Sequence, residues 1–93
     1  MKIIKTGTLV ATRGVAYDMQ ENSDFYNFVR KSFSRHATGD WGDISEEDKA
    51  SNDWALENGE RLFSAYETED NNKIWIITEW DRSVTTILYP EEY

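Results

Sequence analysis

At 93 residues the chain is long enough for one small domain, and its 39% hydrophobic and 14% aromatic content excludes an intrinsically disordered protein. With no cysteine and a single histidine, it has no disulfide framework, no thiolate zinc site, no cysteine nucleophile and no cage of several histidines. The net charge of −8 at pH 7 argues against direct binding of nucleic acid and favours a basic partner.

The amino-terminal residues MKIIKTGTLVATRG contain no continuous apolar run of the kind that a secretory signal needs. No other stretch approaches the roughly 20 apolar residues that span a bilayer. We therefore expect a cytoplasmic protein that does not contact a membrane, organised as a single α+β domain over residues 1–93.

The first half of the chain predicts one strand and one helix. KIIKTGTLVATRG has β-branched residues in loose alternation and ends in Arg-Gly, which indicates a strand running into a turn. Residues 22–39 have apolar residues at helical spacing; Asn22 or Ser23 caps the start and Gly39 ends the helix. The apolar face of this helix consists of Phe25, Phe28, Val29, Phe33 and, in phase with them, His36.

A second helix is predicted over residues 45–59. Ser45 and Asp48 form a pair resembling a capping box, and carboxylates fill the first turn, where the helix dipole favours anions. Gly59 ends the helix. Because the other apolar residues of this helix are mostly alanines, Trp54 is the predicted anchor that holds it on the core.

Three strands follow, with hydrophobic residues in period two. They are RLFSAYETE (61–69), KIWIITEW (73–80) and RSVTTILYP (82–90), and the short turns between them predict an antiparallel meander. The middle strand is apolar on both faces in its first half, which places it inside the sheet. We assign Trp75 and Trp80 on this strand to the core, together with Trp54.

The predicted order is therefore β-α-α-β-β-β, an α+β fold with one antiparallel sheet of about four strands and two helices packed on one face. The N-terminal strand must pair with the meander, because its apolar side would otherwise stay in water. The N-terminal strand and the last strand of the meander are the candidate exposed edges, where a partner could pair or a second copy could form a homodimer.

Charge is distributed unevenly along the chain. Residues 1–36 carry six cations against three anions, a net +3, whereas residues 37–93 carry four cations against fifteen anions, a net −11. The acidic residues are densest between positions 40 and 60, where they face only Lys49. They are Asp40, Asp43, Glu46, Glu47, Asp48, Asp53, Glu57 and Glu60.

His36 is the catalytic candidate, because its imidazole titrates near neutral pH and Asp40 and Asp43 lie close to it in sequence. A metal-independent nuclease would combine His36 with Arg35 and a tyrosine. The alternative, which we favour, is that His36 caps the first helix or packs at the end of its apolar face.

The same region contains oxygen ligands suited to Mg²⁺ or Ca²⁺, on Asp40, Asp43, Glu46 and Glu47. However, DWGDISEED lacks the alternating acidic ligands of an EF-hand loop, and Trp and Ile occupy its interior. We therefore favour a solvated helix start and expect neither a metal nor a cofactor.

Trp41 lies between two Gly-Asp steps in the segment that joins the two predicted helices. An indole in such a place either fills the core or stands out as an anchor for a partner. The presence of four tryptophans in so short a chain favours the core somewhat, and both interpretations stay open.

Three stretches, GDWGD, GERLFSAYE and WIITEWDRSVTTILYPEEY, resemble a family of small acidic proteins carried on bacterial plasmids and integrated mobile elements. Such proteins are often labelled plasmid-related, or as subunit M of a type I restriction enzyme. The second label implies a methyltransferase, but the chain has no glycine-rich cofactor loop and no Asn-Pro-Pro-aromatic motif, so only the mobile-element context is retained. The order of elements is also similar to that of bacterial toxin endoribonucleases, which are typically basic.

These observations favour a non-enzymatic protein that mimics nucleic acid and inhibits a restriction, CRISPR or other DNA- or RNA-processing enzyme. The alternatives are a small toxin-like endoribonuclease that uses His36 and Arg35, and a structural accessory protein that pairs through an edge strand. The predicted partner is a basic nucleic-acid-handling protein, bound by Asp40, Asp43, Glu46, Glu47, Asp48, Asp53 and Glu57 with Trp41 as anchor.

Overall fold

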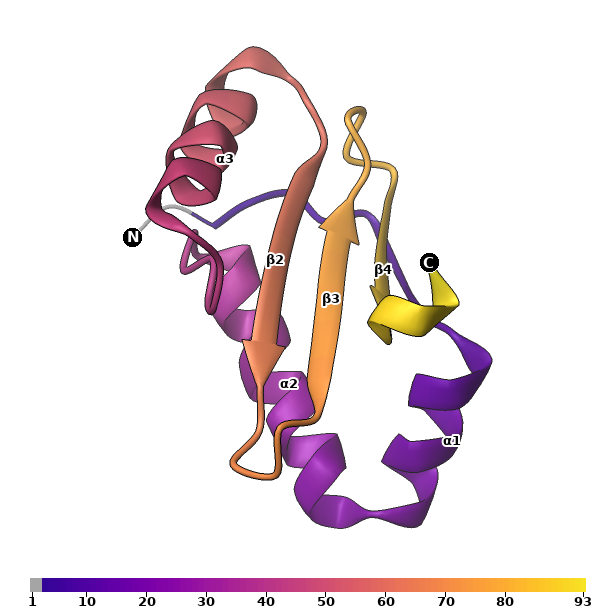
Figure 1. Cartoon of the computed structure of the whole chain (residues 1–93). Coiled ribbons are helices and arrows are strands. Elements are labelled where there is room, and N and C mark those ends of the chain that lie inside the picture. The colour runs from indigo at the N-terminus through magenta and orange to yellow at the C-terminus, as the bar shows by residue number, and fades with distance from the viewer. Residues whose placement is uncertain (1–2) are drawn as a thin grey trace.

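The computed structural model describes residues 3–93 (Figure 1). Lys2, where the predicted first strand begins, lies outside the described residues. The elements follow in the order β-α-α-α-β-β-β, which confirms an α+β fold with a four-stranded sheet. They are β1 (Thr8–Ala11), α1 (Arg13–Glu21), α2 (Ser23–Ala37), α3 (Glu46–Asn58), β2 (Leu62–Glu67), β3 (Lys73–Thr78), β4 (Val84–Leu88) and a short 3-10 helix, η1 (Pro90–Glu92).

The sheet has the strand order β1-β4-β3-β2, and β2, β3 and β4 form the predicted antiparallel meander. β1 pairs with the meander as expected, but it runs parallel to β4, with Thr8 opposite Val84 and Ala11 opposite Ile87. The expectation of a wholly antiparallel sheet is therefore wrong. Alternation of hydrophobic residues is the same whichever way a strand runs, so it predicts a strand without its direction.

The helices α1 and α2 pack on one face of the sheet, and α3 lies beside its β2 edge (Figure 1). α1 is an addition to the two predicted helices. It buries only Val15, and Thr12 at its start makes no capping bond through its side chain, which explains why residues 13–21 carry a weak helix signal. Asn22 then caps α2 as predicted, because its side chain accepts a hydrogen bond from Phe25 N at 3.0 Å.

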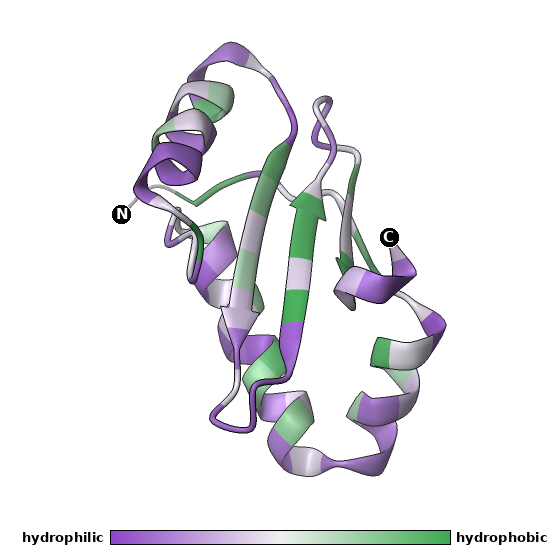
Figure 2. Ribbon diagram, in the orientation of Figure 1, coloured by the Kyte–Doolittle hydropathy of each residue, from purple (hydrophilic) through white to green (hydrophobic). Residues whose placement is uncertain are grey.

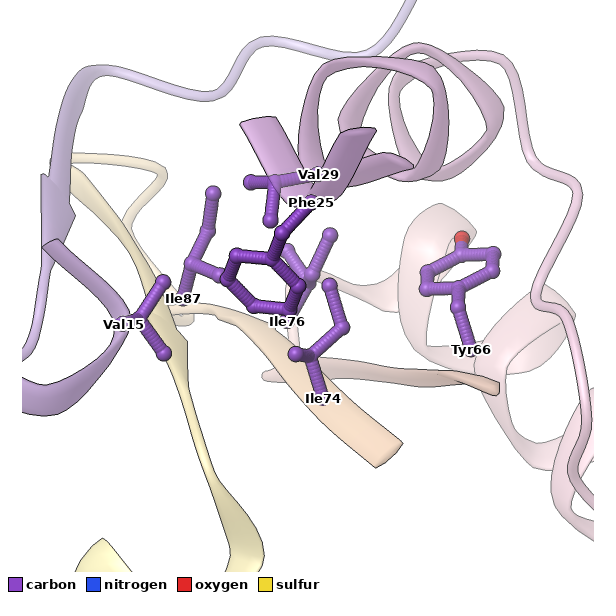
Figure 3. Close-up of a cluster of buried hydrophobic side chains, with 7 residues drawn as sticks. All are labelled: Val15, Phe25, Val29, Tyr66, Ile74, Ile76 and Ile87. Carbon is purple, nitrogen blue, oxygen red and sulfur yellow. The ribbon is translucent and has the colours of Figure 1, made fainter. Parts of the chain in front are cut away.

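The main core lies between α1, α2 and the sheet (Figure 3). In Figure 2 the strands are coloured largely as hydrophobic, whereas α3 is coloured largely as hydrophilic. β3 is an interior strand, as its two apolar faces predict: Ile76 is buried beneath the helices and Ile77 on the opposite face. The main cluster consists of Val15, Phe25, Val29, Tyr66, Ile74, Ile76 and Ile87, and a second cluster of Ile4, Trp41, Ala55 and Leu62 lies under α3.

Two tryptophans assigned to the core are exposed instead, Trp54 by 60% and Trp80 by 65%. α3 is held by the buried Ala55 and by Asn52, whose amide donates to Phe63 O and accepts from Phe63 N at 3.1 Å. A search for apolar residues at helical spacing selects Trp54 as the anchor. It misses Asn52, because this side chain holds the helix through hydrogen bonds to a strand and not through apolar contact.

The two edges of the sheet differ. β4 lies between β1 and β3, so its prediction as an exposed edge is wrong, whereas β1 forms an edge with all four residues exposed. The β2 edge is covered: Gly42 bridges Ala65, and Asp43 N donates to Ala65 O at 2.7 Å. Gly42 has a φ of 78°, and a Cβ there would overlap the Ala65 carbonyl, so this contact requires glycine.

No helix in residues 3–93 combines the length and the apolar content needed to cross a membrane.

Candidate functional site

α3 begins and ends where the sequence predicts. Ser45 Oγ accepts a hydrogen bond from Asp48 N at 3.1 Å, and Gly59, with a φ of 69°, follows the last turn. Arg82 in the β3–β4 turn secures the far end, because its guanidinium donates to Ala55 O at 3.2 Å and to Glu60 O at 2.6 Å. Ser45 therefore caps the first turn of α3, and Arg82 ties its last turn to the β3–β4 turn.

The seven carboxylates predicted to bind a partner are all exposed, but three of them accept hydrogen bonds that join separate segments of the chain. Asp43 accepts from Glu67 N at 3.0 Å, and Asp53 accepts from the indole N–H of Trp41 at 2.9 Å. These two contacts fasten the loop before α3 to β2 and to α3 itself.

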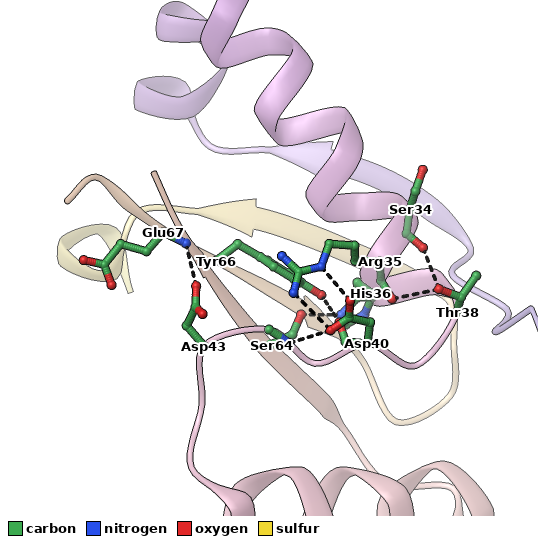
Figure 4. A network of polar contacts seen from close by, with 10 residues as sticks. Ser34, Arg35, His36, Thr38, Asp40, Asp43, Ser64, Tyr66 and Glu67 are labelled. Carbon is green, nitrogen blue, oxygen red and sulfur yellow. Dashed lines mark hydrogen bonds and ion pairs between the residues drawn. The ribbon is translucent and has the colours of Figure 1, made fainter. Parts of the chain in front are cut away.

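Asp40 is the third engaged carboxylate, and it forms a bidentate pair with Arg35 at 2.7 and 3.1 Å (Figure 4). The Arg35 guanidinium, as a hydrogen-bond donor and as a charge, holds the pKa of the Asp40 carboxyl below its ordinary value. The same guanidinium stacks 4.9 Å from the Tyr66 ring centroid, and the Tyr66 hydroxyl donates to Asp40 O at 2.6 Å. Asp40 thus connects the end of α2 to β2.

Trp41 is only 3% exposed and meets His36 edge-on, with ring centroids 5.7 Å apart. It fills the core, so its assignment as a partner-binding anchor is corrected. The prediction failed because the glycine beside it packs against β2 and carries the indole inward, a contact between segments that are distant in sequence.

Three carboxylates share one face of α3 with Trp54, the tryptophan that the sequence assigns to the core and that is exposed. At about 100° per residue of helix, three of the four remaining carboxylates share the face of α3 opposite to the buried Asn52. Asp48, the fourth, lies toward the buried side. We call this face the α3 surface; it consists of Glu46, Glu47, Trp54 and Glu57.

The α3 surface is open to solvent around an exposed indole. Glu46 pairs with Lys49 at 3.5 Å, while Glu47 and Glu57 make no ion pair with any residue between positions 3 and 93. A hollow of about 620 Å³ lies beside Trp54, with Ala50 and Arg61 in its lining. The arrangement offers an exposed aromatic contact with carboxylates on the same helix face and one cation, Arg61, beside it.

His36, the catalytic candidate, is completely buried beneath the sheet. Its Nδ1 lies 2.6 Å from Ser64 Oγ and its Nε2 lies 2.8 Å from Thr78 Oγ1. Burial, with the positive charge of Arg82 as a second cause, lowers the pKa of His36 to about 4. The imidazole is therefore neutral at physiological pH and has no free nitrogen, which is the structural alternative that the sequence favoured.

The hydrogen bonds around His36 fix its tautomer. Thr85 Oγ1 donates to the carbonyl oxygen of Thr6 at 2.7 Å, so it must accept from Thr78 Oγ1, which lies 2.7 Å away. Thr78 has then used its proton and accepts from His36 Nε2–H, which leaves Nδ1 to accept from Ser64. The proton lies on Nε2.

Sequence reasoning missed the partners of His36, although a signal was present. Ser64, Thr78 and Thr85 are hydroxyl residues on the strand face that the alternation assigns to the core. Buried polar groups need hydrogen-bond partners, so aligned hydroxyls on a core face point to a buried polar residue opposite them.

Within residues 3–93, no three His, Asp or Glu side chains converge in a way that would hold a metal ion. Comparison of the chain with family models, with curated proteins and with solved structures finds no match.

Proposed function

We propose that the protein is a non-enzymatic binding protein whose α3 surface occupies the basic, nucleic-acid-binding surface of a DNA- or RNA-processing enzyme, on behalf of a mobile element. The observation that carries the proposal is the indole of Trp54, 60% exposed among the carboxylates of a single helix face. Large aromatic side chains in contact with water are typical anchors of protein interfaces.

Charge and rigidity both support this function. Carboxylates on one side of a helix attract a basic surface and compete with phosphates for the same lysines and arginines. Trp54 adds apolar contact area, and its ring can accept a guanidinium against its face. Because Ser45 caps the first turn of α3 and Arg82 ties its last turn to the β3–β4 turn, binding requires little ordering of the helix.

The endoribonuclease alternative has less support. General acid–base catalysis requires a group within hydrogen-bond reach of the substrate. His36 is buried with both ring nitrogens bonded, and the Arg35 guanidinium is paired with Asp40. These contacts favour structural roles for both residues.

The structural accessory alternative is favoured by β1. Thr8 N and Thr12 N donate toward β4, so the alternation of the strand points the N–H groups of Leu9 and Ala11 away from the sheet. A second copy of the chain could add to this edge as a homodimer. Such pairing uses no residue of the α3 surface, and the two interactions are compatible.

Competition with nucleic acid tests the proposed function. A basic enzyme captured from a bacterial lysate on the immobilised protein is purified, and its binding to a labelled duplex is measured with increasing amounts of the chain. We expect displacement that weakens steeply with salt. The triple variant Glu46→Gln, Glu47→Gln, Glu57→Gln should lose displacement, and so should Trp54→Ala.

A second triple variant, Asp24→Asn, Glu69→Gln, Asp70→Asn, removes the same charge away from α3 and is the matched control. It should displace the duplex as the parent does. If the folded α3 variant competes as well as the parent, with the same salt dependence, the carboxylates of α3 are only a solvated face.

A further inference from the structure

The helix α1 is poorly supported by its own residues. Thr12, at its start, makes no capping hydrogen bond through its side chain, and the first turn contains no acidic residue. Arg13 instead places a cation at the positive end of the helix dipole, and Gly14 is a poor helix former. Of the nine residues of α1, only Val15 is buried. The helix therefore needs support from another part of the chain.

Glu92 of η1 provides that support from 78 positions away. Its Oε2 accepts a hydrogen bond from Gly14 N at 3.1 Å, which is the kind of bond that an N-cap side chain accepts. Its Oε1 accepts from Thr12 Oγ1 at 2.5 Å and from Tyr89 N at 2.9 Å. One carboxylate thus joins the start of α1 to the start of η1, and its charge lies where the helix dipole favours an anion.

We propose that α1, residues 13–21, is a flap that Glu92 holds shut and that opens while the sheet stays folded. The two ends of the flap are held independently of Glu92. Thr12 N donates to Ile87 O at 3.0 Å, and the Asn22 side chain caps α2. Loss of the Glu92 bonds therefore releases α1 without releasing β1 or α2. The flap is independent of the proposed function, because α1 and η1 contribute no residue to the α3 surface.

A second contact between the same segments keeps the flap closed for most of the time. The Tyr89 hydroxyl donates to Asp18 of α1, and the Tyr89 ring lies 6.0 Å from that of Phe25 in the main core. The closed flap adds Val15 to this core. Opening exposes that apolar surface to water, which is unfavourable, so the open state is a minor one.

Gly14 separates the effect of the Glu92 cap from the intrinsic preference of the helix. Alanine is the better helix former, and at this position it should favour the helical state about fivefold. However, a Cβ on Gly14 would lie 2.7 Å from Glu92 Oε2, so the carboxylate would have to move away from Gly14 N. The same substitution should therefore have different effects with and without Glu92.

Native-state hydrogen exchange of the full chain, measured for each amide by NMR, tests the flap. The amides of residues 17–21 should exchange faster than those of β3, and Glu92→Ala should raise their exchange about tenfold, because it removes three hydrogen bonds. Glu91→Ala removes the neighbouring charge and is the matched control, which should leave them unchanged. Ile77→Val, on the sheet face opposite to the helices, should raise the exchange of β3 about fivefold but not that of α1.

The Gly14 substitution gives a second measurement. Gly14→Ala should slow the exchange of α1 about fivefold in the Glu92→Ala background and should not slow it in the parent. Three results would overturn the flap. They are equal acceleration of α1 and β3 in Ile77→Val, which means that α1 opens only with the whole chain, equal exchange of α1 in Glu92→Ala and Glu91→Ala, or equal slowing by Gly14→Ala in both backgrounds.

Discussion

His36 shows how one side chain can be both polar and part of the core. One ring nitrogen accepts a hydrogen bond from the Ser64 hydroxyl, and the other donates to the Thr78 hydroxyl. Thr78 in turn donates to Thr85, and Thr85 donates to the carbonyl oxygen of Thr6. A buried polar network is favourable only when each member has a hydrogen-bond partner. Every buried side-chain nitrogen and oxygen atom among the described residues has such a partner. The network therefore connects α2 to β2, β3 and β4, and to the segment that precedes β1.

The depressed pKa of His36 predicts a loss of stability in acid. In the unfolded chain histidine titrates near pH 6.5, and in the folded protein near 4. Between these values the unfolded state binds more protons, so the free energy of unfolding falls as the pH decreases from 6.5 to 4, by about 3 kcal/mol from this residue. Urea unfolding across this range measures the loss.

Because its pairing with Arg35 lowers the pKa of Asp40, protonation of this carboxylate in acid also reduces the free energy of unfolding. A control must therefore separate the contribution of His36. The variant His36→Gln should be less stable at pH 7 but should show a shallower decline between pH 6.5 and 4. A second readout is the proton resonances of the imidazole, which should not titrate between pH 8 and 5. A normal titration in that range would contradict the buried, neutral ring.

Among the elements, α3 separates anchoring from exposure most clearly. Its inner side consists of Asn52, bonded to β2, and Ala55, which packs with Trp41 and Leu62. Its outer side presents Trp54 to solvent. One helix can thus be held firmly without burying its largest side chain, which leaves the indole free to contact a partner.

This separation predicts opposite results for two tryptophan substitutions. Trp54→Ala should change the free energy of unfolding by less than about 1 kcal/mol, because the side chain is largely in water. Trp41→Ala should cost about 3 to 5 kcal/mol, since it empties a core site and removes a bond to Asp53. Thermal or urea unfolding measures both, and a large loss for Trp54→Ala would show that the indole is buried.

At the scale of the whole molecule, one sheet edge is covered and the other is open. The loop before α3 covers β2, while β1 exposes Leu9 by 47% and Val10 by 40%. The α3 surface lies beside the covered edge, on the opposite side of the sheet from β1. The fold therefore keeps its candidate surfaces apart.

The open edge predicts self-association at high concentration. Light scattering coupled to size exclusion should show a mass that rises toward a dimer as the concentration increases. Leu9→Pro removes an outward N–H while leaving the bonds from Thr8 and Thr12 to β4 intact, so it should keep the chain monomeric. Leu9→Ala is the control and should still associate. A parent that stays monomeric at every concentration would contradict pairing through β1.

The sequence alone determined the features that local patterns encode. The capped start of α2, the two ends of α3, the meander and the interior position of β3 all follow from residues within a few positions of one another. The same holds for the acidic character of α3 and its expected exposure, because charged side chains on a helix face are rarely buried.

Only the tertiary structure decided the direction of β1, which tryptophan fills the core, and the role of His36. Each depends on groups that are far apart in the chain: β1 meets β4, Gly42 meets Ala65, and His36 meets Thr78, 42 residues away. An indole or an imidazole is equally compatible with a core and with a surface until its neighbours are known. The physical reason is that burial and hydrogen bonding are properties of the packed neighbours, which local sequence does not specify.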